Sequence, residues 1–183
     1  MRSLNVNIVF SILILATLCA GCEKKEDLTA IPVYNGPTME LEDIETIFSD
    51  SAITRVKMNA PIQQELQNGN REFPKGIFLQ FYNEKGSPSS TLKSDMARYI
   101  KDENKWLVRG HVVIQSSVQN KKMTTEELWW DPANPDNNKR ITTSKFITIQ
   151  TAQHLLTGEG LQANEDFTWY RIERPIGSFS VAP

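Results

Sequence analysis

The sequence predicts an all-β protein: an antiparallel β-jelly-roll, or open twisted β-sandwich, built from repeated hairpins. Two observations support this fold class. A short phrase recurs four times along the chain, as ELEDI, LKSDM, TTEEL and TGEGL. Between the phrases, apolar and polar residues alternate with a period of two, which is typical of strands that bury one face. A unit that recurs at such intervals usually marks stacked supersecondary elements with one shared core.

The spacing of the phrases indicates what the repeated unit is. They end at Ile44, Met96, Leu128 and Leu161, so the last three lie 32 and 33 residues apart (128 − 96 and 161 − 128). Each of these intervals reads as one β-hairpin. The first interval is longer, and its extra residues, which contain GIFLQFY, read as a hairpin-like insert. We therefore expect hairpins arranged in series.

The first 21 residues read as a lipoprotein signal peptide. Arg2 precedes an apolar run over residues 8–18, and the sequence CAGC follows at 19–22. The run is about half the ~20 residues that a membrane-spanning helix needs. Ala-Gly-Cys resembles a bacterial lipobox, in which Cys22 would be acylated and become the first residue of the mature chain. An ordinary signal peptide cleaved near Ala20 is the alternative.

The region after the predicted cleavage site divides into a tether, residues 22–37, and one folded domain, residues 38–183. The tether contains the charged run EKKED, then prolines and a glycine, a composition that favours a solvated linker. With Cys19 removed and Cys22 acylated, no free thiol remains for a disulfide, a nucleophile or a thiolate metal site. The mature chain has 19 Lys and Arg (20 − 1) against 22 acidic residues, a net charge of −3. This balance offers no basic surface for nucleic acid.

Each strand of the domain is supported by its own alternation. The segment Leu41–Phe48 fits either a short helix or the first strand, and we favour the strand. Residues alternate between two faces in the runs 76–83, 105–115 and 140–150. In the first run, Ile77, Leu79 and Phe81 share one face, while the residues between them point the other way; in the other two runs, apolar residues share one face and polar residues such as Arg109 lie on the other. Asn68-Gly69 is a strong hairpin signal. Turn-forming residues separate the runs at 84–88, 102–104 and 131–137. Of the adjacent residues Trp129 and Trp130, one indole should face inward and the other outward.

The apolar face of these strands supplies the candidate interior of the domain. Its members are Val56, Met58, Ile77, Leu79, Phe81, Trp106, Val108, Val112, Ile114, Leu128, Ile147, Ile149 and Leu161. From the residues alone, these side chains pack on one another as a dry core.

The sequence offers little for catalysis or metal binding. The two histidines, His111 and His154, lie on separate hairpins without a nearby carboxylate pattern, and His111 falls on the polar face of its strand. Glu126 and Glu127 are adjacent on a strand and so point to opposite faces. A metal site needs three or four ligands at a recognisable spacing. We expect no metal, no cofactor and no enzymatic activity.

Several segments together resemble one family. In order they are GPTMELEDIETIFSDSAITRVKMNAP, REFPKGIFLQFYNEKG, TLKSDMARYIKDENKWLVRGHVVI, LWWDP and LTGEGLQANEDFTWYRIERPIGSFSV. This order is similar to LptC, the membrane-attached periplasmic component of lipopolysaccharide export, over about residues 36–181. The resemblance implies a twisted jelly-roll trough that receives lipopolysaccharide from an inner-membrane ABC transporter. It would pass the acyl chains to a periplasmic bridge protein of the same fold, joined by strand addition. Many members have a transmembrane helix where this chain has a lipobox.

The resemblance also assigns roles to residues. All the inward apolar residues named above except Trp106 become lipid-binding candidates, and Cys22 becomes the lipid anchor of an inner-membrane lipoprotein with its domain in the periplasm. The edge that meets the next bridge protein would comprise Gly177, Ser178, Phe179, Ser180 and Val181. The segment 38–60 is the corresponding candidate at the membrane-proximal end. The alternative is a structural or interaction lipoprotein whose strands pair with partners and carry no lipid.

Overall fold

The computed structural model describes residue 34 and residues 36–177. The predicted signal peptide, the anchor Cys22 and most of the tether lie outside the described residues, as do Ser178–Val181 of the predicted partner edge. The boundaries at 21 and 37 therefore stay predictions.

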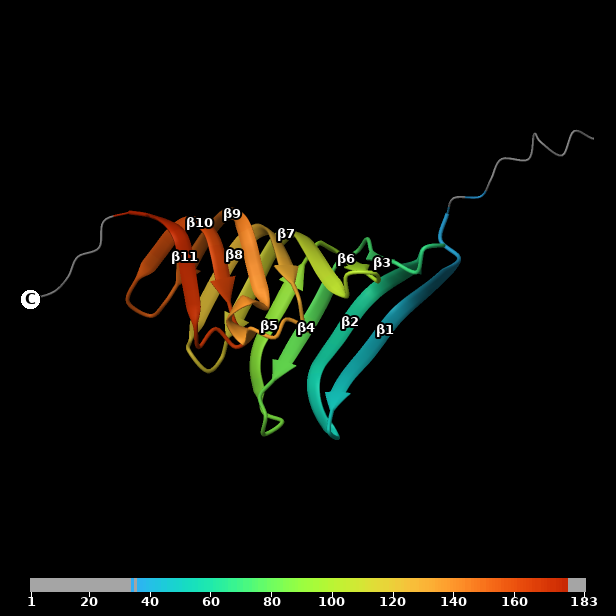
Figure 1. Cartoon of the computed structure of the whole chain (residues 1–183), viewed down its shortest axis with the longest axis horizontal. Coiled ribbons are helices and arrows are strands. Elements are labelled where there is room, and N and C mark those ends of the chain that lie inside the picture. The colour runs from blue at the N-terminus through green and yellow to red at the C-terminus, as the bar shows by residue number, and fades with distance from the viewer. Residues whose placement is uncertain (1–33, 35, 178–183) are drawn as a thin grey trace, which may run out of the picture. The chain divides into compact units, whose positions relative to one another are not determined.

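The described chain forms one antiparallel sheet (Figure 1), which confirms the predicted fold class. Leu41–Phe48 is strand, as favoured above. The only helix among the described residues is the single-turn 3-10 helix η2 (Asn137–Lys139). The 11 strands are β1 (Met39–Asp50), β2 (Ile53–Glu65), β3 (Arg71–Phe73), β4 (Ile77–Tyr82), β5 (Pro88–Ser94), β6 (Met96–Ile100), β7 (Lys105–Ser116), β8 (Lys121–Trp130), β9 (Ile141–Gln150), β10 (Leu155–Ala163) and β11 (Tyr170–Ile176).

Two pairs of consecutive strands, β3–β4 and β5–β6, each behave as one long strand. β3 and β4 follow one another along the same neighbour, because Phe73 lies opposite Ala97 of β6 and Ile77 lies opposite Ser94 of β5. Counted this way, the described residues form nine long strands (11 − 2), each antiparallel to the one before it. The predicted series of hairpins is thus present. The longer first interval holds one additional creased strand, β3–β4. Its second half, β4, carries most of the GIFLQFY run and forms a hairpin with β5, in agreement with the hairpin-like insert expected from the sequence.

A line of backbone irregularities crosses the N-terminal half of the sheet. In β1, Asp43 has φ 48° and lies opposite Pro61, which has no N–H to donate. Gly76, with φ 83°, separates β3 from β4. Asp95 separates β5 from β6, and its N–H donates to the carbonyl of Gly110 at 2.9 Å. Each of these positions interrupts the flat ladder of its strand.

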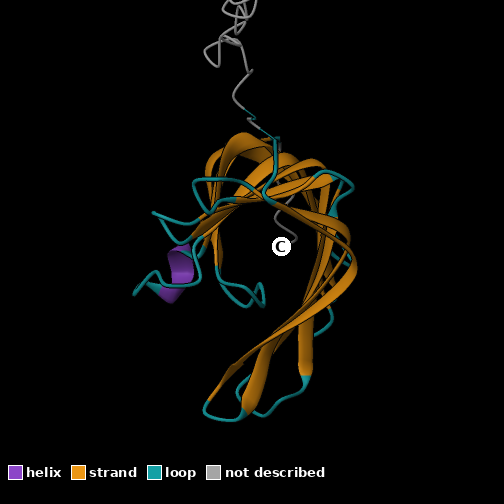
Figure 2. Cartoon of the chain, turned by 90° about the vertical axis from the view of Figure 1, so that its right-hand side faces the viewer, coloured by secondary structure: helices purple, strands orange, loops and turns teal. Residues whose placement is uncertain are grey.

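The same line continues across the C-terminal half. Gly110 and His111 of β7 have φ of 77° and 43°, and the register with β8 shifts at this point. Gly160 of β10, with φ 77°, coincides with a register shift against β9. Extra residues in the left-handed region bend a strand and increase its twist. The recurring phrases fall on this line, so the repeat marks where the sheet creases. Figure 2 shows the strands bending over into two arms.

The crease brings the inner faces of the two arms together and creates the core. Along β4 the predicted alternation is confirmed: Leu79 is fully buried, whereas its neighbour Phe78 is 42% exposed. Trp130 is buried and Trp129 is half-buried, as expected for adjacent strand residues.

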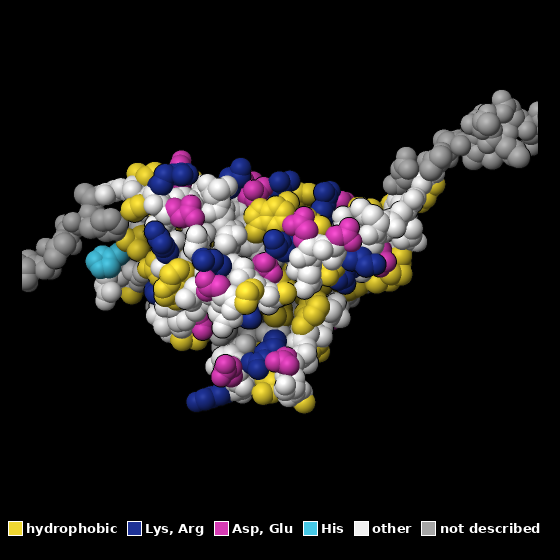
Figure 3. Space-filling model, in the orientation of Figure 1, with side chains coloured by type: hydrophobic (Ala, Val, Ile, Leu, Met, Phe, Trp, Pro, Cys, Tyr) yellow, Lys and Arg dark blue, Asp and Glu magenta, His cyan; other side chains and the backbone are white. Residues whose placement is uncertain are grey.

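The outer side of the sheet carries paired charges. Lys57 of β2 lies 2.9 Å from Glu45 of β1, and Arg174 of β11 lies 3.0 Å from Glu159 of β10. Basic and acidic side chains are interspersed on the face seen in Figure 3. Exposed pairs of this kind contribute about 0–1 kcal/mol each, so the stability of the fold comes from the interior.

His111 differs from the sequence-based expectation that it lacks a carboxylate partner. It is exposed, as predicted, but its ring Nδ1 pairs with the carboxylate of Asp95 across the crease. The hydrogen bond to Asp95, with the charges of Asp95 and then Glu126, raises the pKa of His111 above its ordinary value. The partner was missed because 16 residues separate the pair in sequence, and only the register of β5–β7 brings them together.

The crease predicts an unequal response of two glycines to alanine. A Cβ at Gly76 would lie 2.2 Å from the carbonyl oxygen of Ser94, whereas a Cβ at Gly86, also at positive φ, would meet nothing closer than 3.8 Å. Gly86→Ala should lower the free energy of unfolding by about 1 kcal/mol, from backbone strain alone. Gly76→Ala should cost about 1–3 kcal/mol more, because backbone must move. Urea denaturation measures both, and equal losses would argue against a close approach at the crease.

The His111–Asp95 pair predicts a pH effect of known sign. Because the folded pKa of His111 is raised, the pair stabilises the fold below the unfolded pKa of about 6.5. That stabilisation is lost as the pH rises through the raised folded pKa. An NMR titration should give His111 a midpoint above about 6.5, and Asp95→Asn should return it toward this value. Glu126→Gln, which removes a weaker cause, should shift it less. An unshifted midpoint in the unmodified protein would contradict the pairing.

Candidate functional site

The predicted lipid-binding residues come together in one interior. They lie on β2, β4, β7, β8, β9 and β10 and belong to a single apolar cluster with members on every strand from β2 to β10. None of them is more than 7% exposed. They are Val56, Met58, Ile77, Leu79, Phe81, Val108, Val112, Ile114, Leu128, Ile147, Ile149 and Leu161. The arms of the creased sheet therefore share one continuous apolar lining.

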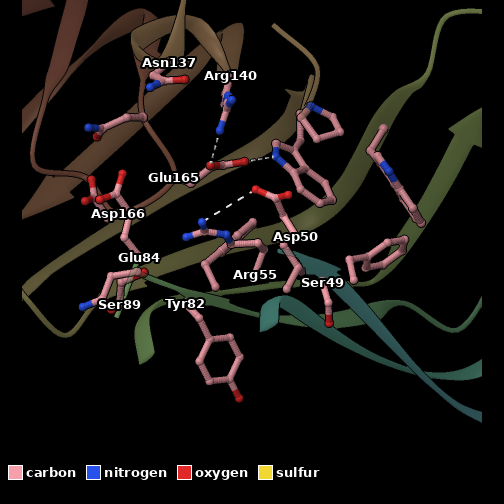
Figure 4. Close-up of a pocket in the computed structure, with 18 of the residues that line it drawn as sticks. Ser49, Asp50, Arg55, Tyr82, Glu84, Ser89, Asn137, Arg140, Glu165 and Asp166 are labelled. Atoms are coloured by element: carbon pink, nitrogen blue, oxygen red, sulfur yellow. Dashed lines mark hydrogen bonds and ion pairs between the residues drawn. The ribbon is translucent and has the colours of Figure 1, made fainter. Parts of the chain in front are cut away.

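A cavity of about 960 Å³ opens from this interior. Its wall is formed on one side by the tips of the β1–β2 and β4–β5 hairpins, and on the other by the loops that follow β6, β8 and β10 (Figure 4). Of the twelve candidates, only Val56 and Phe81 also line the cavity, and Trp106 joins them. The other ten pack on one another. The volume of the cavity is at the upper end of the ~300–1,000 Å³ typical of small-molecule sites.

The floor of the cavity is aromatic. The ring centroid of Trp106 lies 5.8 Å from that of Trp130 and 5.1 Å from that of Tyr99. Trp130 in turn meets Phe81 edge-on at 5.3 Å. These separations are those of favourable aromatic pairs, each worth about 0.5–1.5 kcal/mol beyond the area it buries. Trp130 and Tyr99 were missed as site residues by the sequence analysis. The signal lay in the register, since Trp106 is the cross-strand partner of both.

The rim of the cavity is charged. Glu165 accepts a hydrogen bond from Trp130 Nε1 at 2.8 Å. It also pairs with Arg140 at 3.2 Å, and Figure 4 shows these two side chains facing each other. Across the opening, Asp50 lies 3.7 Å from Arg55. These contacts fix polar groups around an aromatic floor.

One cation at the rim is placed against aromatic rings. The guanidinium of Arg71 lies 4.4 Å from the ring centroid of Tyr99 and 6.0 Å from that of Trp106. A cation over such a ring is held by the ring quadrupole, an interaction of about 0.5–2 kcal/mol. The cavity thus joins an apolar, aromatic floor to a rim that carries both charge signs.

The two ends of the sheet are open edges. In the described chain, β1 pairs only with β2 and β11 only with β10. Unpaired backbone groups along such strands can accept a strand from another protein. Gly177 directly follows β11, and the rest of the predicted partner edge lies outside the described residues.

Two kinds of feature are absent among the described residues. No three His, Cys, Asp or Glu side chains there gather in a group that could hold a metal ion. None of the helices in this part of the chain is long and apolar enough to cross a membrane.

Comparison with known proteins identifies the family. A family model described as "Lipopolysaccharide-assembly, LptC-related" matches residues 12–168. A comparison with curated proteins gives no match. The matched range covers most of the chain and all but the last strand of the sheet, and it confirms the resemblance seen in the sequence. The chain therefore belongs to the LptC-related family and is involved in lipopolysaccharide transport.

Proposed function

We propose that this chain is a membrane-anchored, periplasmic segment of the lipopolysaccharide export bridge. It holds lipid acyl chains in its apolar interior and passes them from an inner-membrane ABC transporter to the next bridge protein. The observation that carries this proposal is the single apolar lining shared by nine strands, β2 to β10, which opens at a cavity with a charged rim.

The physical reason is the cost of exposing acyl chains to water. Each buried methylene gains about 0.8 kcal/mol, so a chain of ~10 methylenes left in water would cost about 8 kcal/mol. A continuous apolar wall removes this penalty along the route. No chemical step is needed, and the energy for movement comes from the transporter.

The rim supports recognition of the anionic head group. Arg71 and Lys85 both line the cavity, and neither has a carboxylate partner in the described part of the chain. Their cationic groups suit lipid phosphates. Of the basic residues near the opening, Arg140 is already paired with Glu165.

The anchor and the docking edges complete the proposal. Acylated Cys22 would hold the domain at the inner membrane, where several acyl chains on one residue give stable attachment. One open edge, β1, would face the transporter. The other, β11 with the residues that follow it, would pair with a bridge protein of the same fold.

The alternative is a structural or interaction lipoprotein that pairs strands with partners and carries no lipid. The open edges support it as well as they support the bridge. The aromatic cavity favours lipid carriage, because a protein that only pairs strands needs no opening into its core.

A photo-crosslinker tests lipid carriage directly. Placed at Phe81, which lines the cavity, it should capture lipopolysaccharide in cells, because the side chain faces the acyl-chain path. Phe78 is the matched control: it is a phenylalanine on the same strand, exposed on the opposite face. Capture at position 81 and not at 78 is the expected result, read by immunoblotting for lipopolysaccharide. Crosslinks from position 81 to protein alone would defeat lipid carriage and leave the alternative.

Strand addition at the C-terminal edge is tested by proline. Phe179→Pro removes a backbone N–H and should weaken pairing with the next bridge protein by tenfold or more, if about 1.4 kcal/mol is lost. Phe179→Ala changes the same side chain but keeps the N–H, so it separates the backbone effect from the loss of the ring. Co-purification of the partner is the readout. Unchanged co-purification with Phe179→Pro would place docking elsewhere.

A further inference from the structure

The loop between β10 and β11, residues 164–169, spans the gap between the two arms of the creased sheet. On one side it is tied to the arm that carries the C-terminal end of β7 and the N-terminal end of β5. Ser116 Oγ donates a hydrogen bond to the carbonyl of Asp166 at 2.7 Å, and Ser90 Oγ donates one to the carbonyl of Glu165. On the other side, the Glu165 carboxylate is held by Trp130 and Arg140. The loop therefore joins the two arms of the creased sheet.

The tip of this loop places an aromatic side chain inside the trough. Phe167 is 1% exposed, belongs to the apolar cluster and lies 6.3 Å from the ring of Tyr170. Its φ of 57° is in the left-handed region, which a phenylalanine rarely adopts. Such a conformation persists where the surrounding contacts hold it. Here, those contacts insert the ring into the interior.

The loop also bounds the cavity. Asn164, Glu165 and Asp166 line it, and the next residue, Phe167, is buried in the apolar cluster. A chain entering over Phe81 and Trp106 would meet this loop before it reached the lining beyond, where Ile172 of β11 packs against the core.

We propose that the loop of residues 164–169 is a plug that occupies the acyl-chain path, and that Phe167 leaves the interior when lipid moves on toward β11. The inference rests on the proposed function and adds a gate to it. The ring fills apolar space that lipid would otherwise fill, so lipid and ring compete for the same lining.

The construction of the loop allows it to move as one piece. It has its own internal hydrogen bonds: Trp169 N–H donates to Asn164 Oδ1 at 3.0 Å, and Asn164 Nδ2 donates to Thr168 Oγ1 at 2.8 Å. These bonds do not depend on the trough. The strand that follows, β11, is an edge with one neighbour. Release requires breaking the contacts of Ser90, Ser116 and Glu165 and withdrawing one ring.

The test uses the full membrane-anchored chain in detergent, with purified lipopolysaccharide as the probe. Photo-crosslinkers at Phe81 and Ile172 report capture before and beyond the plug. Hydrogen–deuterium exchange of residues 164–169 reports the loop itself. On addition of lipopolysaccharide, exchange in the loop should rise several-fold, while exchange in the paired centre of β7 and β8 stays unchanged.

Variants separate the plug from general loosening of the fold. Phe167→Ala should raise capture at position 172 several-fold relative to capture at 81. Phe146→Ala is the matched control, because Phe146 is 52% exposed on β9. This variant should change capture neither at position 81 nor at position 172. Ser90→Ala with Ser116→Ala removes two tethers, together with the hydrogen bond that Gln119 N–H donates to Ser116 Oγ in the β7–β8 turn, and leaves the ring of Phe167 in place. It should therefore raise capture at 172 even if Phe167→Ala fails to fold.

The outcomes distinguish the two proposals. Capture at 81 with no rise in loop exchange, and no effect of either variant on capture at 172, would overturn the plug and leave lipid carriage standing. Absence of capture at both positions would overturn lipid carriage, and the plug with it.

Discussion

The interior of this protein depends on the crease that runs across its sheet. A flat antiparallel sheet with one apolar face needs a second layer to cover that face, and the described chain supplies none. Instead, positive-φ residues such as Asp43, Gly76 and Gly160 lie along one line across the sheet, where its strands bend. The sheet then covers itself, and its two arms bury one shared lining. Without these bends, the apolar side chains would remain in water.

Because the core forms between two arms of one sheet, the arms can be held together at one end of the sheet and stay apart at the other. Toward the C-terminal strands, the loop that carries Phe167 ties the arms together and fills the space between them. Toward the N-terminal strands, the arms stay apart and leave a cavity floored by Trp106 and Trp130. The same fold thus presents an open entrance and a closed interior, and the proposed carriage of an amphiphile needs both.

The strands and the buried face of the sheet could be predicted from the sequence, whereas most residues that line the cavity could not. Period-two alternation was enough to assign the strands and the inward residues, because burial of one face dictates which residues can occupy it. The recurring phrases were recognised, but their meaning as bend points was not, since a bulge is defined by the register with a neighbouring strand. The cavity residues Tyr99, Arg71 and Glu165 come from distant strands and loops, and no local pattern links them. His111 and Asp95 were missed for the same reason.

The central claim is that this interior carries lipopolysaccharide away from the inner membrane. Depletion of the protein in living cells, followed by pulse-labelling of lipopolysaccharide and separation of the two membranes, tests it most directly. Newly made lipopolysaccharide should accumulate at the inner membrane and fail to reach the outer one. Arrival at the outer membrane at the normal rate, with the protein gone, would contradict the claim.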